Sequence, residues 1–229
     1  FNGGPASARN LGAESARGRH LVFLDDDCRP AKKWLSLIAQ ALSKHPRDMI
    51  GGQTINRLSR NPYSVASQCM VDIIYEHFNS RESPIGFFTS NNLALNTELF
   101  RQIGGFNARF ALAAAEDREI CDRWLAAGYR LNYVSNAVLY HLHELDCASF
   151  IKQHLNYGHG ARLYHAIRSQ RGNRPLKVDL EFHGQLIKRL RSPVPDGSFA
   201  LQSRVAVALV LSQLSYIAGY TQARLFDDI

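Results

Sequence analysis

Three consecutive acids follow a short apolar run near the start of the chain. Asp25, Asp26 and Asp27 come directly after residues 21–24, which we interpret as an interior strand, because such a run is typical of a sheet covered on both faces. The strand would present the acids at its carboxyl end. Carboxylates this close together repel one another, so we expect a positive group beside them. Asp25 and Asp27 are hard oxygen ligands that suit Mg²⁺ or Mn²⁺.

A solvated turn or a phosphatase site would account less well for the three acids. A solvated acidic turn needs no ligand, but the apolar run places the acids at a strand end, where open α/β sheets bind their ligands. Haloacid dehalogenase phosphatases also carry acids at such a place. Their DxDx[T/V] pattern requires Thr or Val at the position that Arg29 occupies, so this chain does not follow it.

Further titratable residues lie in the second half of the chain. Glu116 and Asp117 begin the clearest helix, and acids in a first turn complement the helix dipole. His141 and His143 follow an expected strand, and with Cys147 they would form an H-x-H-x₃-C zinc pattern that lacks an evident fourth ligand. Taken alone, the acid pair is explained by the helix dipole and the histidines have no decided role.

The elements that would position these residues alternate between strands and helices, which predicts a mixed α/β sheet. Glycines and prolines that end helices divide the chain into segments. Helices are expected at residues 6–16, 31–43, 64–80, from a cap near Asn96 or Thr97 to Gly104, and from 116 to Gly128; strands are expected at 21–24 and 49–58, before the cap, and after Gly128; residues 80–86 are expected to form a loop.

Composition limits the function classes. The 229 residues are 45% hydrophobic and 21% charged, which is ordinary for a globular protein and excludes wholesale disorder. The net charge of +7 favours anionic partners such as nucleotides, phosphates or an acidic membrane face. Four cysteines without a CxxC pair indicate a reducing compartment, not a disulfide scaffold.

The C-terminal part differs in character from the rest. From Ser149 onward the sequence predicts helices rich in Arg, Lys and His, with a linker at 191–198. Residues 205–223 carry no charge and lie between Arg204 and Arg224. Because this stretch contains Gln and Ser side chains, we expect a helix that packs on the protein or lies at a membrane surface, not one that spans.

The chain resembles the family 2 glycosyltransferases of the GT-A fold. The family pattern combines an Ala-Arg-Asn-x-Gly segment before a strand ending in DxD, a helix ending in Gly-Gly-Phe, a Glu-Asp pair at a helix start, a strand ending in His, and a Tyr-Gly-x-Gly segment downstream. The matching segments, in the same order, are "NGGPASARNLGAESARGRHLVFLDDD", "SNNLALNTELFRQIGGFN", "AEDREICDRWLAAGYRL", "AVLYHLH" and "QHLNYGHGAR". DxD alone is a weak signal, whereas five ordered segments are a strong one.

The resemblance implies a donor site in the first half of the chain. Asp25 and Asp27 would hold the Mn²⁺ or Mg²⁺ ion that bridges the two phosphates of a nucleotide-diphosphate sugar, with Asp26 as the variable middle position beside the donor. Arg9 and Asn10 match the segment near the nucleotide; otherwise these two residues would serve helix packing and capping.

The resemblance also implies the catalytic residues. Asp117 matches the family's catalytic base, with Glu116 beside it, and His141 is expected near the metal or the diphosphate. Asn91 and Asn92 match the segment expected to contact the donor or acceptor sugar. Such a site performs one direct displacement, which inverts the sugar configuration.

The sequence therefore predicts an inverting, hexosyltransferase-type glycosyltransferase with a mainly parallel mixed sheet. Residues 1–148 would form a catalytic core that lacks the family's first nucleotide-binding strands, and residues 149–229 a helical extension. The expected acceptor is a glycan or a lipid-linked sugar, used in polysaccharide, glycolipid or cell-surface glycan assembly. The expected location is the cytoplasm or the cytoplasmic membrane face, and nucleic acid is not an expected partner. The alternatives are a nucleotidyltransferase, which would leave the Glu116–Asp117 segment unexplained, and a non-catalytic nucleotide-sugar or glycan-binding domain.

Overall fold

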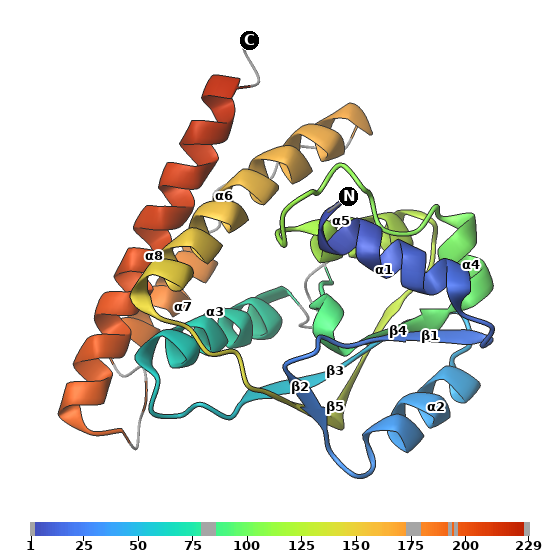
Figure 1. Ribbon diagram of the computed structural model, residues 1–229, viewed down its shortest axis with the longest axis horizontal. Helices are drawn as coiled ribbons and strands as arrows, with labels where there is room; N and C mark the ends of the chain where they lie inside the picture. Colours follow the sequence, from blue (N-terminus) through green and yellow to red (C-terminus); the bar gives the residue numbers. More distant parts are fainter. Residues whose placement is uncertain (1–2, 79–85, 173–179, 192–193, 195–196, 227–229) are drawn as a thin grey trace. The chain divides into compact units, whose positions relative to one another are not determined.

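The computed structural model describes residues 3–78, 86–172, 180–191, 194 and 197–226. The chain divides into two compact units (Figure 1). We call the first the sheet unit; it comprises Phe1–Arg57, Phe78–Ala111 and Glu116–His143. We call the second the helical unit; it comprises Leu58–His77, Leu112–Ala115 and Glu144–Ile229. The predicted division after residue 148 stays a prediction.

The sheet unit contains a five-stranded mixed sheet with the order β1-β4-β3-β5-β2, which confirms the predicted α/β fold class. The parallel share is smaller than predicted, because three of the four pairings are antiparallel and only β3 and β5 run parallel. Parallel pairing is expected where a helix connects two strands that follow each other in the chain and lie side by side in the sheet. Here only β3 and β4 are both consecutive and adjacent, so the alternation of strands and helices does not determine the strand directions. The strands are His20–Phe23 (β1), Cys28–Pro30 (β2), Met49–Asn56 (β3), Leu93–Asn96 (β4) and Leu131–His141 (β5).

The apolar run before the three acids forms β1, but the prediction of an interior strand was wrong. β1 lies at an edge of the sheet formed by the described residues, and Leu24 is exposed beyond its end. Both faces of the strand are covered, as expected. Val22 packs on one face, and on the other the Phe23 ring lies 5.2 Å from that of Phe106. An apolar run in the sequence indicates that both faces of a strand are covered, but it does not indicate whether the strand has a neighbour on each side.

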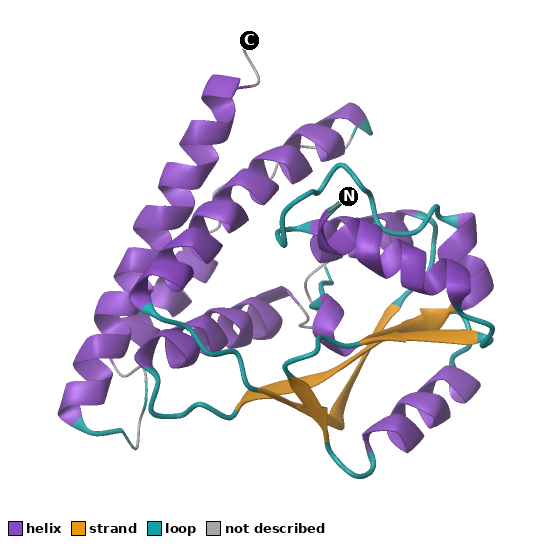
Figure 2. Ribbon diagram, viewed as in Figure 1, coloured by secondary structure: helices purple, strands orange, loops and turns teal. Residues whose placement is uncertain are grey.

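Helices cover both faces of this sheet (Figures 1 and 2). Trp34–Lys44 (α2) packs on one face through Trp34, Ile38 and Leu42, at the spacing of a helix with one apolar side. The helix begins later than predicted because Pro30 belongs to β2. On the other face lie Gly4–Ser15 (α1), Thr97–Gln102 (α4) and Glu116–Ala126 (α5).

The predicted cap of α4 is confirmed. The side chain of Asn96 accepts a hydrogen bond of 3.0 Å from the backbone N–H of Leu99, the third residue of the helix. Gly104 and Gly105 follow the helix with φ values of 83° and 67°, a backbone conformation that residues with a Cβ adopt at a cost. This turn returns the chain toward α1, where the candidate site is built.

Among the described residues, the helical unit contains four helices from distant parts of the chain. One buried cluster combines Ala66 of α3 and Phe150 of α6 with Val205 and Leu209 of α8. The predicted helix at 64–80 is observed as α3. The predicted loop at 80–86 lies outside the described residues except for Gly86, and half of the predicted linker at 191–198 lies outside them as well. The helices are Pro62–Phe78 (α3), Cys147–Gln170 (α6), Leu180–Arg191 (α7) and Phe199–Phe226 (α8).

α6 and α8 lie against each other with almost no space between their backbones at two glycines. A Cβ added at Gly219 would lie 2.0 Å from the carbonyl oxygen of Leu155, and one added at Gly158 would lie 2.1 Å from that of Tyr216. Neither carbonyl can move without its helix. The two helices can therefore pack this closely only because both positions are glycine.

We expect Gly219→Ala to lower the free energy of unfolding by about 2–3 kcal/mol, because the added methyl forces α6 and α8 apart. Urea titration followed by circular dichroism measures this. Gly184→Ala in α7 is the matched control, since a Cβ there meets no atom within 4 Å and should raise helix stability by about 0.5–1 kcal/mol. Equal effects of the two substitutions would contradict the close packing.

α8 is the one helix, among those that the structure describes, that is long and apolar enough to cross a membrane. Residues 199–223 reach a mean hydropathy of 1.2, and 28% of the most apolar window is buried inside the protein. Core helices of soluble proteins pass the same test of length and composition. The finding thus marks α8 as a candidate for membrane contact.

Candidate active site

The three acids form the turn between β1 and β2. The backbone N–H of Cys28 donates a 3.1 Å hydrogen bond to the carbonyl of Asp25, which closes the turn. Asp25 and Asp27 are partly buried, whereas Asp26 is exposed. Each of the two outer acids has its own cationic or ionisable partner, which supplies the compensation expected from the sequence.

Arg9 of α1 joins the two acidic segments of the chain. Its guanidinium donates to Asp25 Oδ1 at 3.0 Å and to Glu116 Oε1 at 2.8 Å. The guanidinium carbon lies 5.7 Å from the centre of the Phe106 ring, and both Arg9 and Glu116 are largely buried. A buried arginine between two carboxylates is held in place strongly, because either acid without it would be an unpaired charge. The turn after β1 and the start of α5 thereby belong to one site.

The second outer acid, Asp27, pairs with a histidine at the end of β5. His141 Nε2 lies 3.2 Å from Asp27 Oδ1, and the His143 ring stacks on the His141 ring with centres 4.9 Å apart. The antiparallel pairing of β2 with β5 places His141 opposite Cys28. The structure therefore brings His141 next to Asp27, and its place near a metal or a diphosphate stays a prediction.

Asp27, Cys28 and His141 offer ligand atoms that lie within 4.8 Å of one another. Burial and the nearby acids raise the pKa of the Cys28 thiol to about 12, and a neutral thiol is a soft donor that suits Mn²⁺ or Mg²⁺ less well than oxygen does. The remaining carboxylate oxygen and imidazole nitrogen suit a divalent ion such as Mn²⁺. The alternative zinc pattern of His141, His143 and Cys147 does not occur among the potential metal-binding groups of the described residues.

Asp117 lies in the first turn of α5, next to the Glu116 that Arg9 holds. Its Oδ1 accepts a 2.8 Å hydrogen bond from the backbone N–H of Arg118. Burial and the neighbouring Glu116 raise the pKa of Asp117 to about 7, against the lowering effect of Arg9 and of backbone N–H groups. A carboxylate that titrates near neutral pH is suited to accept a proton from a substrate hydroxyl.

The residue before this acid pair has a strained backbone. Ala115 has φ 66°, and it is the one non-glycine residue with positive φ in the part of the chain described here. An alanine in this region costs on the order of 1–2 kcal/mol. Strain of this kind is typical of functional sites, so Ala115 supports the assignment of Glu116 and Asp117 to the site.

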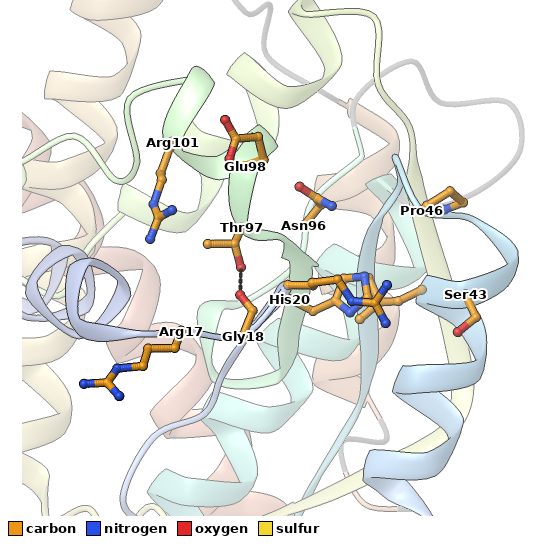
Figure 3. A pocket seen from close by; sticks show the side chains of 11 residues that line it. Arg17, Gly18, His20, Ser43, Pro46, Asn96, Thr97, Glu98 and Arg101 are labelled. Carbon is orange, nitrogen blue, oxygen red and sulfur yellow. Dashed lines mark hydrogen bonds between the residues drawn. The ribbon is translucent and has the colours of Figure 1, made fainter.

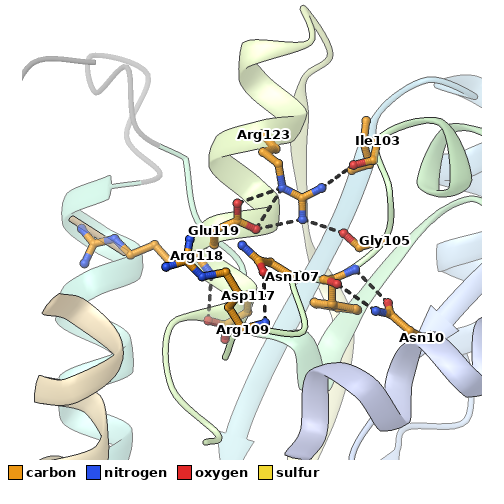
Figure 4. A network of polar contacts seen from close by, with 10 residues as sticks. Asn10, Ile103, Gly105, Asn107, Arg109, Asp117, Arg118, Glu119 and Arg123 are labelled. Carbon is orange, nitrogen blue, oxygen red and sulfur yellow. Dashed lines mark hydrogen bonds and ion pairs between the residues drawn. The ribbon is translucent and has the colours of Figure 1, made fainter. Parts of the chain in front are cut away.

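Asn10, predicted to lie near a nucleotide, also makes hydrogen bonds within the protein. Its side chain donates to the carbonyl of Phe106 and accepts from the Phe106 N–H, both at 2.8 Å. Arg123 of α5 holds the same turn, since it pairs with the buried Glu119 and donates to the carbonyls of Ile103 and Gly105 (Figure 4). These contacts attach α1 to α5 and so position Arg9.

Asn91 and Asn92 are both buried. Asn92 accepts a 2.9 Å hydrogen bond from the Trp34 indole N–H and donates to the carbonyls of Gln53 and Ala137. Asn91 accepts from the hydroxyls of Thr54 and Thr89 at 3.3 and 2.8 Å. The structure therefore brings Arg9, Asp25, Glu116 and Asp117 together, whereas the amides of Asn91 and Asn92 are bound within the protein.

Two residues of the site were not found from the sequence. Cys28 is part of the group around Asp27, and its position directly after the acids was the available signal. Phe106 supports the Arg9 guanidinium with its ring. Only the resemblance of the Gly-Gly-Phe segment pointed to that position, and nothing local linked it to Arg9.

A hollow of about 530 Å³ lies at the opposite end of β1 from the three acids (Figure 3). Gly18 and His20 line it together with Thr97, whose hydroxyl donates to the Gly18 carbonyl at 2.7 Å. Arg17, Arg19 and Arg101 add positive charge. None of the predicted site residues lines this hollow, so it is separate from the candidate active site.

Comparison with known proteins gives the following relationships. The family model described as "Glycosyl transferase family 2" matches residues 1–114. A pre-mycofactocin glycosyltransferase of Mycobacterium tuberculosis is 25% identical over 184 residues, which are 76% of this chain and 37% of that protein. A chondroitin synthase of Pasteurella multocida is 24% identical over 166 residues, covering 59% of this chain and 17% of that protein. The chain thus spans well under half the length of these curated relatives.

The fold also occurs in a solved structure. The mannosyltransferase PcManGT from Pyrobaculum calidifontis, determined in complex with GDP-Man and Mn²⁺, superimposes with a TM-score of 0.59 at 17% sequence identity. The superposition covers 99% of this chain and 68% of that one. At this identity the similarity is one of fold.

Proposed function

The chain belongs to family 2 of the glycosyltransferases and has the GT-A fold, and from that premise we propose that it is an inverting, hexosyltransferase-type enzyme. It moves a sugar from a nucleotide-diphosphate donor to a hydroxyl of a glycan or lipid-linked acceptor. The observation that carries this proposal is the pairing of Arg9 with both Asp25 and Glu116. This pairing supports a single site in which the donor acids and the base act together.

Asp117 is the proposed catalytic base. As the acceptor oxygen attacks the anomeric carbon, Asp117 takes the hydroxyl proton, the bond from that carbon to the diphosphate breaks, and the nucleoside diphosphate leaves with the electron pair. A single displacement of this kind inverts the configuration. A pKa near 7 supports the role, because the carboxylate is then both available and basic enough to accept a proton. Glu116 is proposed to remain paired with Arg9 and to hold Asp117 in place.

The proposed metal is Mn²⁺ or Mg²⁺, held by Asp25, Asp27 and His141. The oxygen and nitrogen atoms that Asp27 and His141 present fit such an ion, and the complex of PcManGT with Mn²⁺ gives further support. When bound, the ion supplies charge neutralisation for the leaving diphosphate. Without the ion, the ion pair with Arg9 offsets the charge of Asp25.

The remaining predicted residues divide into contacts and supports. Arg9 and the exposed Asp26 are proposed to lie against the nucleotide-sugar, and the hydrogen bonds of Asn10 to Phe106 support a positioning role for Asn10. Because Asn91 and Asn92 are buried, we propose that they support the sugar site from inside the protein.

A cytoplasmic location is the proposed setting of this activity. In the described part of the chain, no disulfide joins Cys28, Cys69, Cys121 or Cys147. Cysteines outside disulfides are the usual state in a reducing compartment, which supports the proposal.

Mass spectrometry of reaction products tests the proposed function. The protein is incubated with a panel of nucleotide-diphosphate sugars, Mn²⁺ and hydroxyl acceptors, and we expect a glycosylated acceptor together with a nucleoside diphosphate. NMR of the product should show the inverted anomeric configuration. Release of pyrophosphate with transfer of a nucleoside monophosphate would instead identify a nucleotidyltransferase, and binding without any product would identify a non-catalytic domain.

Replacement of Arg9 is expected to change the pH dependence of the reaction. Arg9→Gln removes the positive charge that lowers the pKa of Asp117, so the acidic limb of the profile of kcat/KM against pH should move to higher pH. It should also destabilise the protein by about 2 kcal/mol, because Glu116 loses its partner. Arg17→Gln is the matched control, since no ion pair of Arg17 occurs among the described residues. A limb that stays in place would show that Arg9 does not act on the base.

A further inference from the structure

α8 presents an apolar stripe to the outside of the helical unit. Val207, Val210, Leu214 and Ile217 are between 47% and 60% exposed. Their spacing of three, four and three residues places them on one face of the helix, over a length of about 15 Å. Large apolar side chains gathered in this way, and not scattered singly, mark an interaction surface.

The opposite face of α8 already has its partners. Val205, Ala208 and Leu209 are buried in the cluster that α3 and α6 share with this helix, and Gly219 lies against α6. Ser212 and Ser215 are also buried on that side. The exposed stripe is therefore not a core face of the helical unit, and a partner outside the unit must cover it if anything does.

The charge of this part of the chain indicates what kind of partner that is. Residues 147–229 contain eleven Lys and Arg but five Asp and Glu, a net charge of +6 out of the +7 that the whole chain carries. The positive charge of the protein is thus concentrated in its C-terminal part. Arg204 is exposed three residues before Val207, the first residue of the stripe. An exposed apolar face on a positively charged unit is the chemistry that recognises an anionic lipid surface.

We propose that the helical unit docks on an anionic lipid bilayer through α8, with the helix lying in the interface. The stripe ends at the exposed polar residues Thr221 and Gln222, and the other face of α8 is held by protein, which suits shallow insertion better than a span. A second copy of the chain is the weaker occupant. The stripe offers a few hundred Å², whereas a stable dimer buries roughly 800 Å² on each partner and would bring the two positive units together.

Vesicle co-sedimentation of the 229-residue chain tests this surface. We compare vesicles of phosphatidylcholine alone with vesicles that also contain phosphatidylglycerol, at low salt and at about 0.5 M NaCl. Binding is expected with the anionic vesicles at low salt, and it should weaken strongly at high salt. The double substitution Leu214→Gln and Ile217→Gln should lower the partition coefficient by about tenfold or more.

Leu35→Gln is the matched control, because Leu35 of α2 is 60% exposed and Leu214 is 59% exposed. It should leave vesicle binding unchanged, and circular dichroism should show the same melting for all variants. Equal sedimentation of the double variant and the native chain would overturn the proposal. So would a dimer in analytical ultracentrifugation that the double substitution dissociates, or retention of the native chain on vesicles after an alkaline carbonate wash, which would mean a span.

Discussion

Asp117→Asn is expected to lower turnover by at least roughly 10²-fold while leaving donor binding nearly unchanged. Asparagine keeps the size of the side chain and can still accept the hydrogen bond from the Arg118 N–H, but it cannot take a proton from the acceptor. Steady-state kinetics and calorimetry with a nucleoside diphosphate separate the two effects. Asp122→Asn in the same helix is the control. If turnover survives in Asp117→Asn, the base lies elsewhere, and Glu116 is the first candidate.

Because the pKa of Asp117 is raised, pH should act in opposite directions on the turnover and on the stability of the native protein. Turnover of the native protein should rise as the pH increases through about 7, since the base must be deprotonated. Stability should change the other way. The pKa of Asp117 in the folded protein lies above its value of about 3.9 in an unfolded chain. The contribution of Asp117 to the free energy of unfolding is therefore complete below pH ~3.9 and is lost as the pH rises through about 7.

Urea titrations at pH 5 and pH 8 measure this contribution. We expect Asp117→Asn to be more stable than the native protein at pH 8 by on the order of 1 kcal/mol or more, and to lose most of this advantage at pH 5. If the substitution removes activity and adds stability, then Asp117 is a residue whose partly buried carboxylate lowers stability but is needed for the reaction. Equal stability at pH 8 would mean that Asp117 titrates normally.

Asp27→Ala is expected to abolish the metal dependence of nucleotide binding. Native protein should bind a nucleoside diphosphate at least about tenfold more tightly with Mn²⁺ than with a chelator, because the ion joins the acids to the phosphates. Asp27→Ala should bind with the weak affinity in both conditions. Isothermal titration calorimetry with UDP and GDP measures both.

Asp26→Ala tests whether this effect belongs to Asp27 in particular. The two acids are adjacent and carry the same charge, but Asp26 is exposed whereas Asp27 lies beside His141. The Asp26 variant should keep its response to Mn²⁺ and lose affinity only slightly. An equal loss in both variants would indicate a general effect of negative charge and would remove the metal role of Asp27.

Local signals explain why part of the site could be predicted from the sequence. Three acids after an apolar run, an asparagine three residues before a helical N–H, and acids at a helix start each depend on neighbours in the chain. The turn of Asp25–Asp27 and the cap at Asn96 were found for this reason. The edge position of β1 was missed because it depends on pairing with β4, some 70 residues further on.

The contacts that complete the site depend on distant segments. Arg9 meets Glu116, which is 107 residues away, and nothing near either residue identifies its partner. The same holds for Asn92, whose hydrogen bonds reach α2, β3 and β5. Buried amides such as this one are recognised as structural only once their partners are known.

The division of the chain into units that are not continuous has a consequence for synthesis on the ribosome. The apolar side of α3 is made early, but it packs against Val205 and Leu209, which emerge roughly 140 residues later. At about 5–20 residues per second, α3 would wait on the order of 10 s for its partner. During that interval the nascent chain exposes a hydrophobic helix, so we expect it to be a substrate for ribosome-associated chaperones until α8 arrives.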